Sequence, residues 1–367
     1  MVFILMLIIL LAGAAGWAVG AAWLAIMAFR ESTGRGFTYL LIPFYSLYFG
    51  PKRWPKTKIP FLILSAGLGI LILFILVIVP FGFSYMLTHA NSRPSDQAVN
   101  ANALHAEVAF REVEFKSKDG VLLSGWYLPR ENAPAAIIYC HGLFRSRLEM
   151  LDRAEKFGQA GYAGLLLDFR RHGKSGGELT SMGYLERLDV IGAVHFLRDS
   201  LQFQQPIVVH GVSMGAATAL LAAADDSAIA GLIVDSSFLS FDNTITHHAR
   251  LYFNLPKFPI VDELILFTKW RAGFRSEDFD LRRAVQKIGN RPILFFAGGA
   301  DTRMPPEIAQ ALYDASPSTH KSIKIIENAS HGKAFDTDPE IYTQAVLHFL
   351  QSVDEIYGSN NEKDANP

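Results

Sequence analysis

A serine stands between two glycines near the middle of the chain, in the segment Gly211-Val-Ser213-Met-Gly215. It follows a β-branched run that starts at residue 206 and precedes an alanine-rich stretch, so a strand, a sharp turn and a helix are predicted in that order. The glycines permit the turn, because a Cβ there would collide with the neighbouring strand and helix. This context predicts a nucleophilic serine at the tip of the turn, and an ordinary tight turn is the alternative.

A nucleophilic serine needs a base and an acid, and two residues in the last third of the chain can supply them. Asp301 follows an apolar, strand-like segment at 291–297, and His331 lies in a loop after the strand expected near residue 321. Both positions follow the carboxyl end of a predicted strand, where open α/β sheets place their active sites. In this order, Ser213 would attack, His331 would accept its proton, and Asp301 would orient the imidazole.

Other roles for these and nearby residues stay open. Asp235, after the strand expected near 229, is a rival acid, and Asp301 could merely cap the helix that follows it. Asp301 is favoured because Gly-Gly-Ala-Asp followed by proline is the more typical setting of the acid. The adjacent His247 and His248 have no carboxylate at metal-ligand spacing and are expected to be polar surface residues.

A predicted strand near residue 135 ends in a turn that can hold an oxyanion. The turn reads Cys140-His141-Gly142-Leu143, and the backbone N–H groups of Leu143 and of Met214, the residue after the serine, are the expected donors. His141 could instead only hydrogen-bond the loop and shape the turn. Cys140 is the only cysteine, which excludes an intrachain disulfide and a zinc cluster, and it is expected to be buried and inert.

Several segments together resemble a known family. They are His141-Gly-Leu-Phe-Arg-Ser-Arg, the run from Leu165 to Gly176, Gly211-Val-Ser-Met-Gly, Asp301 and His331-Gly. In them the chain resembles the α/β-hydrolase superfamily, in the branch of serine aminopeptidases, lysophospholipases and acylglycerol lipases. The resemblance implies an α/β-hydrolase fold and a serine hydrolase, but not a substrate, because the superfamily includes esterases, lipases, peptidases, thioesterases and transferases. Arg171 stands where the family usually has glycine, and Arg170 is expected to be a structural link.

The surrounding pattern agrees with that fold over about residues 106–355. Alternating segments at 108–115 and 121–128 predict an antiparallel hairpin. Strands expected near 135, 163, 206, 229, 291 and 321 alternate with helices near 147–159, 184–199, 213–224, 305–315 and 340–355, which predicts a mostly parallel sheet of the eight-stranded type with helices on both faces. The aromatic stretch at 238–275 is expected to be a short helical insertion, which either covers the site or packs on the sheet.

The first ninety residues have the composition of a membrane anchor. Uncharged apolar stretches at about 2–29 and 61–87 each exceed the roughly 20 residues that span a bilayer, so two transmembrane helices are predicted. Six basic residues and one acid lie between them, which places this loop in the cytoplasm and the hydrolase domain on the extracytoplasmic side. If the apolar segment 39–49 crossed as well, rather than lying in the interface, the domain would be cytoplasmic. A linker is expected at 91–105 and a disordered tail at 356–367.

Composition narrows the function classes. The 367 residues are 50% hydrophobic and carry a net charge of −1, which gives no support for nucleic-acid binding. No cofactor or metal is expected. The sequence therefore predicts a membrane-anchored serine hydrolase that cleaves acyl esters through an acyl-enzyme, with lipids and lysophospholipids as candidate substrates. The alternatives are a non-catalytic membrane scaffold or receptor, and a peptidase or thioesterase that uses the same triad.

Overall fold

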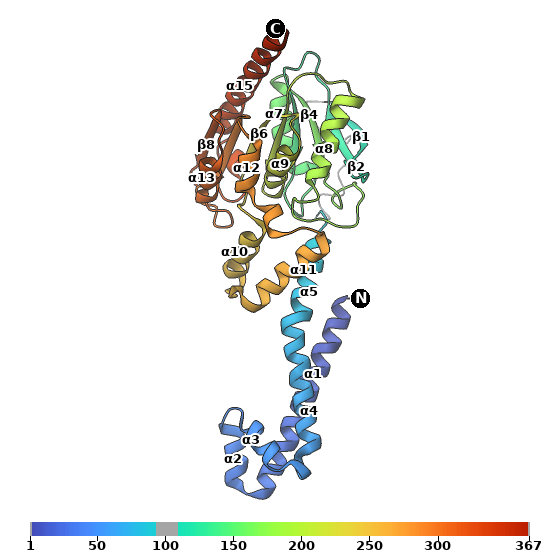
Figure 1. Cartoon of the computed structure of the whole chain (residues 1–367), viewed down its shortest axis with the longest axis vertical. Helices are drawn as coiled ribbons and strands as arrows, with labels where there is room; N and C mark the ends of the chain where they lie inside the picture. The colour runs from blue at the N-terminus through green and yellow to red at the C-terminus, as the bar shows by residue number, and fades with distance from the viewer. Residues whose placement is uncertain (1, 93–108, 366–367) are drawn as a thin grey trace. The chain divides into compact units, whose positions relative to one another are not determined.

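The computed structural model describes residues 2–92 and 109–365. Two compact units are present, and each is described by itself (Figure 1). The first comprises Met1–Tyr85 and Leu255–Phe267, and the second comprises Met86–Asn254 and Thr268–Pro367. The expected linker at 91–105 lies almost entirely outside the described residues.

The first unit is helical. Its elements, some of which continue into the second unit, are α1 (Val2–Glu31), α2 (Thr33–Leu41), α3 (Tyr45–Lys52), α4 (Trp54–Leu73), η1 (Phe74–Ile78), α5 (Val79–Thr88), η5 (Lys257–Val261) and α11 (Asp262–Ala272). The helices over Ile4–Glu31 and Trp54–Thr88 are long and apolar enough to cross a membrane. The second begins at Trp54 rather than near the expected residue 61, because the helix continues through the basic residues that precede its apolar part.

Close packing joins the two long helices. α1 and α4 run side by side, and a Cβ at Gly67 would lie 2.2 Å from the backbone nitrogen of Trp17, so only glycine permits this approach. Between the helices, the segment expected to lie in the interface forms the short helices α2 and α3. Glu31, the one acid of this loop, pairs with Arg35 and Arg53 at 2.5 Å each.

An eight-stranded sheet forms the second unit, as predicted. Its strands are β1 (Arg111–Lys116), β2 (Leu122–Leu128), β3 (Ala136–Cys140), β4 (Ala163–Leu167), β5 (Ile207–Val212), β6 (Ile229–Asp235), β7 (Ile293–Gly298) and β8 (Lys321–Ile326). They lie in the order β1-β2-β4-β3-β5-β6-β7-β8, with β2 antiparallel to both its neighbours and the other pairs parallel. The central strands β3, β4 and β5 are buried throughout, which is why they appear in the sequence as continuous apolar runs.

Helices cover both faces of this sheet (Figure 1). The helices of this unit are η3 (Arg147–Met150), α7 (Leu151–Gln159), α8 (Arg187–His195), η4 (Phe196–Ser200), α9 (Met214–Asp225), α10 (Phe241–Phe253), η6 (Ser276–Phe279), α12 (Leu281–Ile288), α13 (Pro306–Ala315), α14 (Ala334–Thr337) and α15 (Pro339–Ala365), and α10 lies beyond the end of the sheet. α15 extends to Ala365, so the expected disordered tail from residue 356 is corrected: most of that segment prolongs the last helix.

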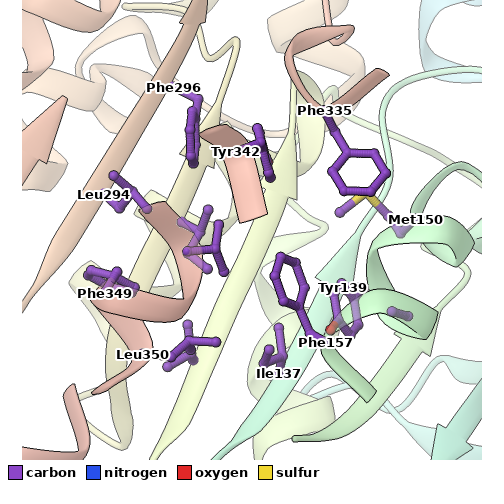
Figure 2. Close-up of a cluster of buried hydrophobic side chains, with 14 of the residues drawn as sticks. Ile137, Tyr139, Met150, Phe157, Leu294, Phe296, Phe335, Tyr342, Phe349 and Leu350 are labelled. Carbon is purple, nitrogen blue, oxygen red and sulfur yellow. The ribbon is translucent and has the colours of Figure 1, made fainter. Parts of the chain in front are cut away.

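One large core lies between the sheet and the helices α7 and α15. Figure 2 shows Tyr342 of α15 stacked against Phe296 of β7, with Phe335 beside it; the Phe296 and Tyr342 ring centroids are 3.9 Å apart. Phe157 of α7 and Tyr139 of β3 complete this part of the core. The packing fixes α7 and α15 beneath the strand ends from which the site residues project.

Candidate active site

Ser213 occupies the sharp turn between β5 and α9. Its backbone has φ 56° and ψ −114°, a conformation that few residues with a side chain adopt. The flanking glycines are required, since a Cβ at Gly211 would lie 2.3 Å from the Gly215 carbonyl carbon, and one at Gly215 would lie 2.1 Å from the Cys140 oxygen. The strand therefore delivers the serine hydroxyl to the start of a helix, where N–H groups favour negative charge.

A hydrogen-bonded chain links the serine to a histidine and an aspartate. His331 Nε2 lies 2.8 Å from Ser213 Oγ, and His331 Nδ1 lies 2.7 Å from Asp301 Oδ2. A neutral imidazole satisfies both contacts when Nδ1–H donates to the carboxylate and Nε2 accepts the serine proton. The His331 side chain is 11% exposed and that of Asp301 is 0% exposed, so the carboxylate that contacts the imidazole is shielded from water.

The structure pairs His331 with Asp301 and not with Asp235. Asp301 also caps its own loop, as the alternative interpretation supposed, because Oδ1 accepts the N–H groups of Arg303 and Met304 at 2.9 Å each. One carboxylate oxygen thus fixes the loop, while the other contacts the histidine. Asp235 is fully buried on the neighbouring strand, and its carboxylate bonds to other partners.

The turn after β3 presents the other expected groups. Among the described residues, no protein acceptor engages the N–H of Leu143 or Met214, which leaves both free for an oxyanion. His141 shapes this turn: its Nδ1 donates to the Gly142 oxygen at 2.7 Å, and its Nε2 accepts the Phe169 N–H at 3.1 Å. Burial, followed by the neighbouring His172, lowers the pKa of His141 to about 3, so this imidazole stays neutral. Its role is structural.

A cavity of about 520 Å³ opens onto this group of residues. Ser213, His331 and Leu143 line it, and much of the rest of its wall is charged. The charged residues are Arg145, Glu149, Asp152, Arg153, Arg303, Lys333 and Asp336. Arg145 pairs with Glu149 at 3.1 Å, and Lys333 pairs with Asp336 at 2.6 Å. The volume is that of a small-molecule site, and its wall suits a polar ligand group.

Two residues of this wall were not foreseen from the sequence. Glu149 accepts the Gly142 N–H at 2.6 Å, so its carboxylate holds the turn that contains Leu143. Arg153 donates to the backbone oxygens of Glu149, at 3.3 Å, and of Gly332, at 3.4 Å. Both lie on the η3–α7 segment. From the sequence alone they look like ordinary charged residues on the surface of a helix, because their partners are distant along the chain.

The expectation that both adjacent histidines lie on the surface holds for only one of them. His247 is exposed, as expected, and its Nε2 bonds to the Thr302 oxygen at 2.9 Å, which ties α10 to the loop after Asp301. His248 is partly buried, and burial, followed by the nearby Arg303, lowers its pKa to about 4. Neither belongs to a metal site: across residues 2–92 and 109–365, no group of three or more His, Cys, Asp or Glu side chains could hold an ion.

The motif around Arg170 behaves as the resemblance implied. Arg170 bonds to Asp119 in the β1–β2 turn and to Asp189 in α8, so it links the loop after β4 to two other elements. Arg171 adopts a φ of 62°, which explains why glycine is usual there. Cys140 is buried and free, and burial raises the pKa of its thiol.

Known proteins share both the sequence and the fold. Residues 131–258 match the family described as serine aminopeptidase S33. Protein YqkD of Bacillus subtilis is 28% identical over 74% of this chain and 92% of its own length. Protein bem46 of Schizosaccharomyces pombe is 24% identical over 67% of this chain and 78% of its own. A relative in Saccharomyces cerevisiae, 24% identical over 66% of this chain and 80% of its own, is described as a membrane protein.

Among solved structures, the esterase Pf2001 of Pyrococcus furiosus superposes with a TM-score of 0.61 at 25% identity, covering 72% of this chain and 97% of the esterase. These similarities extend over the sheet and its helices, and they support a hydrolase of esterase-like function. The strand order and the turn between β5 and α9 agree with these similarities. The protein has the α/β-hydrolase fold.

Proposed function

We propose that this protein is a membrane-anchored serine hydrolase that cleaves acyl esters through an acyl-enzyme intermediate. The observation that carries the proposal is the continuous hydrogen-bonded chain from Ser213 through His331 to Asp301, with distances of 2.8 and 2.7 Å. These contacts allow the histidine to take a proton from the serine, while the carboxylate fixes the tautomer of the histidine.

The acylation step follows from this geometry. Ser213 Oγ attacks the ester carbonyl carbon as its proton passes to His331 Nε2, and the carbonyl oxygen becomes an oxyanion. The N–H groups of Leu143 and Met214 donate to that oxyanion, and each such donor is worth about 3–4 kcal/mol in the transition state. His331 then gives its proton to the departing alkoxide, and the acyl group remains on Ser213.

Deacylation repeats the same steps with water. A water molecule attacks the acyl carbonyl, His331 Nε2 takes its proton, and the carboxylic acid leaves as Ser213 recovers its hydrogen. Asp301 stabilises the imidazolium in both halves of the reaction and does not itself become protonated. No metal or cofactor takes part in this proposal.

The anchor favours a substrate at the membrane. Two helices in the first unit are long and apolar enough to span a bilayer, and the insertion segment Leu255–Phe267 belongs to the same compact unit. Within it, the Phe267 ring contacts the Phe81 ring of α5, with centroids 5.5 Å apart. If Trp54–Thr88 spans the membrane, this contact brings the insertion to the bilayer surface. The anchor would therefore keep the hydrolase at the membrane, where acyl lipids are found.

The charged residues of the cavity wall indicate what kind of alcohol leaves when the ester is cleaved. Arg303 offers a cationic group to the cavity and Asp152 offers an acceptor, whereas Glu149 and Lys333 are already paired with Arg145 and Asp336. Such a wall fits the hydroxyls or the charged head group of a monoacyl lipid, or of an acylated envelope component, better than it fits a second acyl chain. The hydrolase therefore acts on esters with a polar alcohol part.

A labelling and turnover assay tests the proposal. The full-length protein in detergent is treated with a fluorophosphonate probe, and wild type should be labelled, while Ser213→Ala should be neither labelled nor active, because the variant lacks the attacking oxygen. Thermal unfolding serves as the control for folding. A wild-type protein that resists the probe, or a Ser213→Ala variant with wild-type turnover, would contradict the proposal and favour a scaffold.

Substrate class is tested with the same preparation. Reconstituted enzyme receives either a soluble short-chain ester, a soluble acyl amide, or a monoacyl lipid in vesicles. We expect the highest kcat/KM with the monoacyl lipid. Equal turnover of the soluble ester would remove the preference for lipids, and faster cleavage of the amide would assign a peptidase.

A further inference from the structure

Beneath the triad lies a buried polar cluster that none of the proposed chemical steps uses. Its centre is Asp235, the last residue of β6, whose side chain is 0% exposed. Ser236 Oγ donates to Asp235 Oδ1 at 2.9 Å, and the Tyr342 hydroxyl donates to Oδ2 at 3.1 Å. Among the described residues, Arg153 is the one cation within ion-pair distance of Asp235, and its Nη2 lies 3.8 Å from Asp235 Oδ2.

Packing fixes the members of this cluster. Tyr342 is stacked on Phe296 (Figure 2), and its oxygen lies 2.8 Å from His210 Nε2. Because the tyrosine proton goes to Asp235, the histidine must be the donor in that contact. The guanidinium of Arg153 lies 5.0 Å from the centre of the Phe335 ring, and its side chain is 4% exposed. These side chains therefore have little freedom to rearrange.

Two members of the cluster hold the residue after the triad histidine. The Gly332 N–H donates to Ser236 Oγ at 3.1 Å, and the Gly332 oxygen accepts from Arg153 Nη2 at 3.4 Å. Gly332 has a φ of 68° in a turn that the Lys333 N–H closes onto the Ser330 oxygen at 3.0 Å, and the two side-chain contacts fix this turn against the rest of the site. Both peptide groups around Gly332 are thus anchored to partners of Asp235, directly beside His331.

The same cluster also reaches the nucleophile and the oxyanion turn. The backbone oxygen of Asp235 accepts the Ser213 N–H at 2.9 Å. Arg153 donates to the Glu149 oxygen, and the Glu149 carboxylate accepts the Gly142 N–H. A single buried pair is consequently connected to all three parts of the proposed machinery.

We propose that Asp235 and Arg153 form a buried positioning pair, which acts through Ser236 to set the loop of His331 against Ser213. This inference rests on the proposed hydrolase function. Burial raises the pKa of the Asp235 carboxyl, and the Arg153 cation and the two hydroxyl donors oppose that effect. Loss of either partner leaves a buried charge uncompensated and releases Gly332. Asp235 does not line the cavity, so its replacement should affect kcat and not KM. Arg153 also lines the cavity, so its variants are judged by kcat alone.

The sharpest variant is Ser236→Ala, which removes one hydroxyl and leaves the ion pair in place. Since a small misplacement of a catalytic group costs one to two orders of magnitude, we expect kcat to fall about tenfold in Ser236→Ala and about a hundredfold in Asp235→Asn. Arg153→Lys should retain more activity than Arg153→Met, because the lysine keeps the charge. The rate of fluorophosphonate labelling should fall in parallel with kcat, while KM for a soluble ester stays constant in Ser236→Ala and Asp235→Asn.

Asp189→Asn is the matched control. Asp189 forms an equally buried pair with Arg170, at 2.7 Å, and neither residue lines the cavity. This variant should lose thermal stability and keep the kcat of wild type per labelled serine. The kinetic constants of all variants are measured on full-length protein, with the concentration of active serine taken from the labelling endpoint.

The outcomes separate the two proposals. An unlabelled wild type would refute the hydrolase itself. A labelled wild type with kcat for Ser236→Ala and Asp235→Asn within about twofold of normal would refute the positioning pair alone. The pair would also be refuted if KM rose at constant kcat, or if Asp189→Asn lowered kcat as much as Asp235→Asn does.

Discussion

Two aspartates lie close to the site, and their different partners predict different consequences of mutation. Asp301 contacts His331 Nδ1, whereas Asp235 makes no hydrogen bond to the histidine and contacts Ser236 and Arg153 instead. Asp301→Asn should therefore lower kcat by about 10⁴-fold, because an amide can present its N–H to Nδ1 and reverse the tautomer. Steady-state kinetics of both variants would check the ranking. A larger loss in Asp235→Asn would move the triad acid to β6.

The sequence identified the residues that have a local signature and missed those that do not. Ser213 has its glycines, Asp301 its glycine-rich strand end, and His331 its glycine-flanked loop, so each could be found by its neighbours along the chain. Glu149 and Arg153 have no such mark. Their significance comes from Gly142 and Gly332, to which only the folded sheet brings them.

At the scale of elements, the strands were the easiest to predict. Strands β3 to β7 are parallel and covered on both faces, so each appears in the sequence as a continuous apolar run between turn residues. The insertion was predicted only as helical and aromatic. Its division into α10, η5 and α11 could not be predicted, because η5 forms where the chain packs against η1, far away in sequence.

The insertion was expected either to cover the site or to pack on the sheet, and its aromatic residues divide between burial and exposure. Phe241 is buried, whereas Phe258 is 76% exposed and Trp270 is 70% exposed. Phe267 packs on Phe81 within the first unit. The aromatic contact between this segment and α5 therefore contributes to holding the insertion in place.

A proteolysis experiment tests that contact. Phe267→Ala should weaken the packing of the insertion on α5 by about 1 kcal/mol, which raises the population of the detached insertion about fivefold. Cleavage of the insertion by a dilute protease should accelerate in proportion. Leu266→Ala, at an adjacent position that is 56% exposed, is the control and should leave the rate unchanged. Equal cleavage rates for the two variants, measured on full-length protein in detergent, would show that the ring pair does not hold the segment.

For the whole molecule, buried histidines predict how stability depends on pH. Burial lowers the pKa of His141 to about 3 and also lowers the pKa values of His172 and His210. The unfolded chain, with histidine pKa values near 6.5, therefore binds more protons than the folded protein below that pH. Burial raises the pKa values of Asp189 and Asp235, which works in the opposite direction.

The histidine contribution is complete above about pH 6.5 and is lost as the pH falls. Between pH 6.5 and 5, a histidine whose folded-state pKa is about 3, such as His141, should cost about 2 kcal/mol, so the histidines decrease the free energy of unfolding on acidification. Thermal unfolding of the detergent-solubilised protein at pH 7 and pH 5 measures the change. His210→Phe should reduce the difference between the unfolding midpoints at pH 7 and pH 5, since it removes one titrating group from the core. A midpoint that does not change with pH would mean that the aspartates cancel the histidines.

The distribution of charge around the two long helices predicts which side of the membrane carries the hydrolase unit. Between the apolar stretches at 2–29 and 61–87 lie six basic residues and one acid, Glu31, which forms ion pairs with Arg35 and Arg53. Basic loops stay in the cytoplasm, and with two spans both ends of the chain then lie on the opposite side. Alkaline phosphatase fused after Pro367 should therefore be active, and green fluorescent protein at the same position should be dark.

The matched control for this topology changes the loop charge. Replacing Lys52, Lys56 and Lys58 by glutamine together should lower the phosphatase signal, because the loop then loses half of its basic residues. A bright fluorescent fusion and an inactive phosphatase in the unmodified protein would place the catalytic unit in the cytoplasm. That result would imply that the chain enters and leaves the bilayer differently, with the segment of α2 and α3 as the next candidate for a crossing. The accessible lipid pool would then be the cytoplasmic leaflet, while the triad chemistry would be unaffected.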